Sequence, residues 1–149
     1  MKKTIPYALF TGAALIAYFL IMKLLGLETN FYLRIFNFVI MTGGIYLLYR
    51  HTFKQGRSEH VGYLQALLMG AKLTTIAVVV FIIFLAAYIK LIDPSFVKVL
   101  DNAGIWSLNG VSLIQAMLGI LIEGLASGYV ISFVLMQFFK SSIPSRDSA

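Results

Sequence analysis

Four long apolar stretches constrain this chain more than any other feature of its sequence. They cover about residues 6–27, 31–49, 63–92 and 111–139, with short polar segments between them. A helix of about 20 apolar residues is long enough to cross the roughly 30 Å hydrocarbon core of a bilayer. The stretches are apolar on every side and do not alternate, so they predict membrane-spanning helices and not barrel strands.

The composition supports a membrane environment. Hydrophobic residues make up 60% of the 149 residues and charged residues only 12%, whereas soluble domains carry about 25% charged residues. A water-soluble fold of this size could not bury so much apolar surface. We therefore expect one membrane domain over residues 1–149, surrounded by the lipid bilayer.

The positions of Lys and Arg predict the orientation of the chain. The net charge is +6, but the sequence has no basic stripe with interleaved aromatic residues, so nucleic-acid binding is not expected. By the positive-inside rule, the side with more basic residues faces the cytoplasm, which places both termini there. That side carries Lys2, Lys3, Arg50, Lys54, Arg57, Lys140 and Arg146, and the other carries Lys23, Arg34, Lys90 and Lys98.

The connections between the apolar stretches differ in character. Residues 28–30 are so few that the first two helices must form an antiparallel hairpin. Residues 50–60 are expected to form a polar cytoplasmic loop. Asp93 and Pro94 are typical of a helix start, with Asp93 as N-cap and Pro94 at the first helical position.

A short helix is expected to follow that start, over about residues 94–103. Its apolar residues share one face, which favours a helix lying flat on the outer membrane surface with Trp106 as an interface anchor. A plain surface loop is the alternative. The expected fold is thus all-α: a four-helix transmembrane bundle with cytoplasmic N- and C-termini and an outer interfacial helix before the last span.

Small residues indicate where helices pack in a membrane, because lipid competes with larger apolar side chains. Gly124 and Gly128 stand at GxxxG spacing in the last helix, with Gly119 nearby, and Gly70 occupies a similar position in the third. We expect these glycines to pack helix against helix within one chain. Dimerisation through the GxxxG face is the alternative.

Lys72 and Glu123 are the two charged residues deep inside apolar stretches. A charge at the bilayer centre costs about 2.5–3.5 kcal/mol on insertion scales, so such residues usually face the bundle interior. Counting along the helices places Lys72 and Glu123 at depths about 9 Å apart, which disfavours a direct ion pair. Three interpretations remain for both residues: structural contacts between helices, contacts with a partner, or a transport pathway. For Glu123, the neighbouring small residues favour burial.

Neither a catalytic site nor a cofactor site is expected. P-loop, GxSxG, HExxH and dinucleotide motifs are absent, as are paired carboxylates in an aqueous cleft. His51, His60 and Glu59 share one loop, but the nine-residue separation of the histidines fits no compact metal site. We therefore predict no metal and no enzymatic activity.

From Tyr63 onward the sequence resembles a bacterial family of small membrane proteins catalogued as domain of unknown function 4199. The features that carry the resemblance are Tyr49-Arg50, Tyr63, Gly70, Tyr88, Asp93-Pro94, Glu123-Gly124, Gly128 and Lys140. The resemblance implies a multi-pass protein of four helices in the bacterial inner membrane. It implies no activity, substrate or catalytic residue.

The sequence favours a non-enzymatic membrane protein that acts as a small accessory or structural subunit of a membrane complex. Little of the chain lies outside the apolar stretches, and its small-residue faces suit contacts between helices. A membrane-protein partner or a homo-oligomer is therefore expected. The alternative is a small oligomeric transporter of an ion, proton or solute that uses Glu123 and Lys72.

Overall fold

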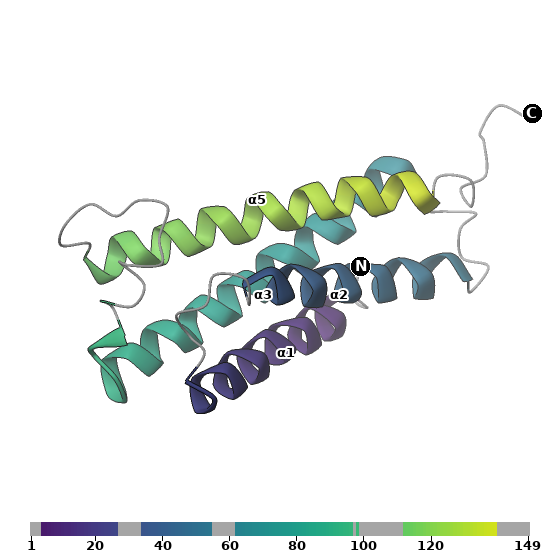
Figure 1. The fold of residues 1–149 in the computed structure, drawn as a ribbon. Helices are drawn as coiled ribbons and strands as arrows, with labels where there is room; N and C mark the ends of the chain where they lie inside the picture. The colour runs from purple at the N-terminus through teal and green to yellow at the C-terminus, as the bar shows by residue number, and fades with distance from the viewer. Residues whose placement is uncertain (1–3, 27–33, 55–61, 97, 99–111, 140–149) are drawn as a thin grey trace, which may run out of the picture.

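The structure, a computed structural model, describes residues 4–26, 34–54, 62–96, 98 and 112–139 (Figure 1). Four long helices account for most of this part of the chain, which confirms the predicted all-α class. They are α1 (Thr4–Leu24), α2 (Arg34–Lys54), α3 (Tyr63–Leu91) and α5 (Leu113–Phe139).

Two helix ends differ from the predicted ones. α1 ends at Leu24, not at residue 27, because Gly26 adopts a left-handed conformation with φ of 65°. Its backbone N–H bonds to the carbonyl oxygen of Lys23 at 3.1 Å, which closes the helix end. α2 continues to Lys54, so the polar loop expected from Arg50 begins inside a helix. A helix satisfies its own backbone groups in any solvent, and polar residues can therefore extend it past the apolar stretch.

Contacts between the helices define two ends of the bundle. α3 packs against α1 and α5, while α2 packs against α1, α3 and α5. At one end, the ring of Tyr7 meets that of His51 at 5.6 Å, and Gln137 donates a hydrogen bond to Tyr63. These contacts join the start of α1, the end of α2, the start of α3 and the end of α5. Successive helices therefore run in opposite directions.

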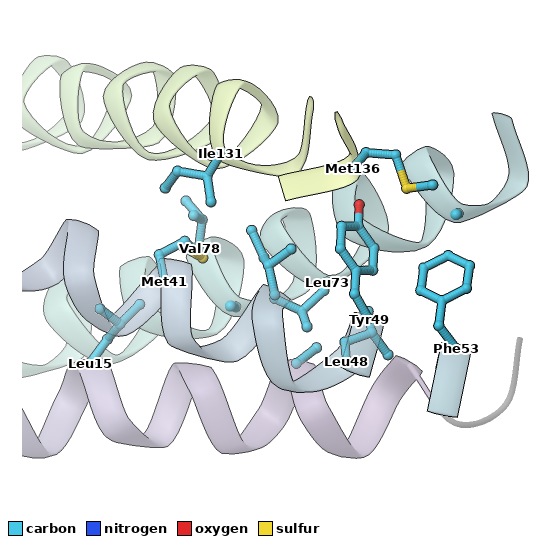
Figure 2. Packing of buried hydrophobic residues seen from close by; sticks show 13 residues of the cluster. Leu15, Met41, Leu48, Tyr49, Phe53, Leu73, Val78, Ile131 and Met136 are labelled. Carbon is cyan, nitrogen blue, oxygen red and sulfur yellow. The ribbon is translucent and has the colours of Figure 1, made fainter. Parts of the chain in front are cut away.

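The core contains hydroxyl groups and small residues as well as apolar side chains. Thr11, Thr74 and Ser132 are fully buried, and Ser132 donates to the carbonyl oxygen of Gly128 within its own helix. Figure 2 shows how the larger buried side chains fill the space between the four helices. The labelled ones are Leu15, Met41, Leu48, Tyr49, Phe53, Leu73, Val78, Ile131 and Met136.

The outer surface, by contrast, is rich in large apolar side chains. At least half of the surface of Ile83, Leu118 and Phe138 is exposed, at 65%, 50% and 77%. A soluble protein rarely exposes such a continuous apolar surface. α1, α3 and α5 are each long and apolar enough to cross a membrane. The described helices are therefore those of a membrane protein.

Glycines stand where helix backbones approach most closely. A Cβ at Gly128 would overlap Thr74 of α3, and one at Gly70 would overlap Tyr49 of α2 and Ser132 of α5. At Gly124 a Cβ would lie 3.0 Å from the side chain of Val78. Gly119, also predicted as a packing position, has open space beside it. The GxxxG pair thus packs against α3 of the same chain.

Candidate functional site

Lys72 lies on the side of α3 that faces away from the bundle. Its side chain is exposed, as are those of Leu68, Val79 and Ile83, which lie near the same line along the helix. Gln65, two turns earlier, is also exposed. The polar groups of Gln65 and Lys72 therefore face outward from the chain and do not form a buried seam.

Glu123 differs from its predicted environment. The small residues beside it suggested burial in the bundle, but the side chain is exposed. It lies next to Gly124, whose face packs on α3, and lines a cavity together with residues of α2. Burial was inferred from the cost of a charge in lipid and from the small size of the neighbouring residues. The close contact with α3 uses only part of that small-residue surface.

A cavity lies between α2 and α5, beside Glu123; we call it the α2–α5 cavity. Its volume is about 280 Å³, and side chains of α1 and α3 also line it. Its polar residues are Asn37, Glu123 and Ser127. The remaining lining residues are Leu15, Ile35, Phe38, Met41, Val78, Phe81, Ile120 and Gly124.

Asn37 contributes an unsatisfied polar atom to this region. Its Oδ1 is buried and has no hydrogen-bond partner. The position of Asn37 in an apolar stretch predicts a hydrogen bond to a neighbouring helix, but this oxygen makes none. Ser127 donates its hydroxyl hydrogen to the carbonyl oxygen of Gly124 at 3.1 Å, which leaves its oxygen able to accept.

Lys72 and Glu123 do not form a common site. Both residues lie within described helices, yet neither a hydrogen bond nor an ion pair joins them, as their different depths predicted. Lys72 is also outside the lining of the α2–α5 cavity. A relay that passes through both residues within one chain therefore has no support from these contacts.

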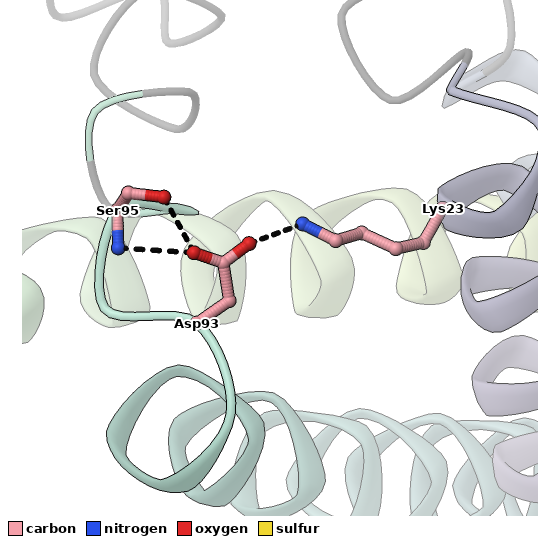
Figure 3. A network of polar contacts seen from close by, with 3 residues as sticks. All are labelled: Lys23, Asp93 and Ser95. Atoms are coloured by element: carbon pink, nitrogen blue, oxygen red, sulfur yellow. Dashed lines mark hydrogen bonds and ion pairs between the residues drawn. The ribbon is translucent and has the colours of Figure 1, made fainter.

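A second polar group closes the opposite end of the bundle, where α1 and α3 end. Lys23 Nζ lies 2.5 Å from Asp93 Oδ2, and the backbone N–H of Ser95 donates to Asp93 Oδ1 at 3.2 Å (Figure 3). The bond from Ser95 is the one expected of an N-cap at Asp93. Hydrogen bonds from Lys23 and Ser95 lower the pKa of Asp93.

Aromatic rings surround the Lys23 ammonium group. Nζ lies 4.7 Å from the ring centroid of Phe96 and 5.7 Å from that of Tyr88. Phe19, one turn before Lys23, contacts both rings edge-on. Pro94 is exposed in the turn that follows α3. Trp106 and most of the predicted helix over 94–103 lie outside the described residues.

Only weak sequence signals point to the contacts of Lys23 and Asn37. Lys23 was assigned only to membrane orientation, because its partner is 70 positions away and nothing local indicates the pair. Asn37 was considered only as a helix–helix contact. Of the three residues weighed as metal ligands, only His51 is described, and its ring packs against Tyr7.

Comparisons of this chain with protein-family models, with curated proteins and with solved structures each found no match. The resemblance to the bacterial four-helix family therefore stays a prediction.

Proposed function

We propose that this chain is a non-enzymatic, four-span protein of the bacterial inner membrane that serves as an accessory subunit of a larger membrane complex. Both termini face the cytoplasm in this proposal. The observation that carries it is the exposed position of Lys72 on α3, on the side opposite the core. The sequence resemblance to a four-helix inner-membrane family points in the same direction.

The fourth span of this proposal is α2, which is less apolar than the other three helices. Its 21 residues match the length of α1. It packs between α1 and α5 and buries Met41, Ile45 and Leu48 against them. Its outward side chains are also apolar, which suits contact with lipid. They include Ile35, Phe36, Phe38, Val39, Tyr46 and Leu47.

Lys72 is costly in lipid at this position. It stands nine residues after the start of α3, which corresponds to a depth of roughly 13 Å. A lysine side chain that leans toward its helix N-terminus covers only part of that distance. A charge exposed to hydrocarbon is disfavoured by about 2.5–3.5 kcal/mol. A partner helix with a carboxylate or another acceptor would remove this cost, and Gln65 on the same face adds a second polar contact.

The test is site-specific photocrosslinking in bacterial cells. A benzophenone amino acid at Leu68, one turn from Lys72, samples the membrane surface beside the charge. We expect one discrete crosslinked protein, and we expect Lys72→Met to reduce its yield severalfold. Lys90→Met is the matched control, because Lys90 is exposed in the last turn of the same helix.

Two results would contradict the subunit proposal. Crosslinks to lipid alone at Leu68 would mean that no protein covers Lys72. A crosslinked product with the mass of two copies of this chain would mean that the chain forms a homo-oligomer and is not a subunit of a larger complex. The same crosslinker at Phe10, an exposed position of α1, shows whether any adduct is specific to the Lys72 face.

A further inference from the structure

We propose that the α2–α5 cavity binds the head group of a membrane-soluble hydroquinone, with the hydroxyl groups of the ring donating to Asn37 and Glu123. The proposal is independent of the subunit function, because Lys72 does not line the cavity. It follows from the size of the cavity, its polar atoms and its aromatic side chains.

The size of the cavity suits a head group and not a whole lipid. Its volume of about 280 Å³ lies just below the 300–1,000 Å³ range that is typical of ligand pockets. Most of its lining is apolar, and Ile35 and Phe38 are exposed at its edge. A ligand can therefore place a ring inside and leave an apolar tail in the surrounding hydrocarbon.

The polar groups of the cavity favour a ligand that donates hydrogen bonds. Asn37 Oδ1 has no partner, and the Ser127 hydroxyl already donates to Gly124. Carboxyl oxygens together offer about four acceptor positions, so Glu123 can accept a further bond beside a contact it already makes. Asn37 and Glu123 come from α2 and α5, the two walls of the cavity. The two hydroxyl groups of a hydroquinone ring match these acceptors in number, with one acceptor on each wall.

The aromatic lining favours a flat ring over a linear alcohol. Phe38 of α2 and Phe81 of α3 both line the cavity, and Met41 lies with them. Aromatic rings and methionine sulfur make favourable contacts with a bound ring. An oxidised quinone has the same shape but lacks the hydroxyl donors, so it should bind more weakly.

The test is a binding titration of the full chain in lipid nanodiscs with decylubiquinol, using empty discs as the blank. We expect saturable binding of decylubiquinol, and binding of decylubiquinone that is about a hundredfold weaker, because it lacks both hydroxyl donors and each lost bond costs about tenfold. Asn37→Leu and Glu123→Leu should each weaken decylubiquinol binding by about tenfold. Gln65→Leu is the matched control, since it removes an exposed amide outside the cavity and should change nothing.

Each alternative result overturns the proposal. Equal binding of the quinol and the quinone would mean that the acceptors are not used. Stronger binding of dodecylamine than of decylubiquinol would mean that the cavity prefers a cationic ligand to a hydroquinone. Thermal unfolding checks that the variants fold, and Asn37→Leu should not destabilise the chain because it removes an unpaired buried oxygen. A folded Asn37→Leu variant with unchanged affinity would exclude the site.

Discussion

The ammonium group of Lys23 lies 2.5 Å from the carboxylate of Asp93, although 70 positions separate the two residues. The pair joins the last turn of α1 to the turn that follows α3. Both side chains are partly shielded, at 20% and 27% exposure. The centroid of the Phe96 ring lies 4.7 Å from the ammonium nitrogen, which stacks over that ring. The contact therefore joins the C-terminal ends of α1 and α3.

Acid should weaken this junction. Hydrogen bonds from Lys23 and Ser95 hold the pKa of Asp93 below its usual value. The stabilisation is therefore complete above the unfolded pKa of about 3.9, and it is lost as the pH falls through the lower, folded pKa. Near neutral pH, we expect the midpoint of thermal unfolding in detergent to be higher for wild type than for Asp93→Asn. The two midpoints should converge in acid.

The control for this titration is Lys98→Gln, which removes an exposed charge from the same turn. Its unfolding midpoint should follow that of wild type at every pH. High salt should reduce the difference between the unfolding midpoints of wild type and Asp93→Asn, because the ion pair is only partly shielded from solvent. A gap that stays constant down to pH values well below about 3.9 would mean that the ion pair does not stabilise the fold.

Gly128 should tolerate no larger residue. It is buried, and an added Cβ would overlap the side chain of Thr74, whose own Cβ would be 2.9 Å away. We expect Gly128→Ala to destabilise the bundle by about 1–3 kcal/mol through overpacking. Gly119→Ala in the same helix is the matched control. It meets open space and should be neutral or stabilising by up to about 1 kcal/mol.

Unfolding in mixed micelles of increasing SDS fraction measures both changes. The double variant Gly128→Ala/Thr74→Ala should recover part of the loss, because it removes the two Thr74 atoms that would overlap the new methyl group most, Cγ2 and Oγ1, and leaves only the Cβ contact. Equal stability of Gly128→Ala and Gly119→Ala would contradict the packing of α5 on α3 at this position.

The four long helices of the described residues and their all-α class followed from the sequence, because the thickness of a bilayer sets the length of an apolar stretch. Tight packing at Gly128 and Gly70 was also foreseen, since only small residues let helices approach closely in lipid. The end of α2 was placed too early. The criterion was loss of apolar character at Arg50, whereas the backbone continues its own hydrogen bonds to Lys54.

Which side of each helix faces inward was harder to predict. In a soluble protein, polar residues mark the outer face, but in lipid both the core and the outer surface are apolar. Glu123 was expected in the interior because a charge in lipid is costly and its neighbours are small, yet it is exposed beside the α2–α5 cavity. The Lys23–Asp93 pair was missed because only the packing of α1 on α3 brings the two residues together.

Single-cysteine labelling should show that α2 crosses the membrane. The chain contains no cysteine, so one introduced thiol gives an unambiguous signal. Leu25→Cys and Ser95→Cys stand just beyond the ends of α1 and α3, and both positions are exposed. Thr52→Cys stands in the last turns of α2, at the opposite end of the bundle.

A membrane-impermeant maleimide added to intact spheroplasts should label Leu25→Cys and Ser95→Cys. It should label Thr52→Cys only after the membrane is opened, because in the proposed topology α2 returns the chain to the cytoplasmic side. Labelling of both Leu25→Cys and Thr52→Cys in intact spheroplasts would place the two ends of α2 on one face. Its apolar outward residues, such as Phe36 and Leu47, would then lack the lipid contact that the four-span arrangement gives them.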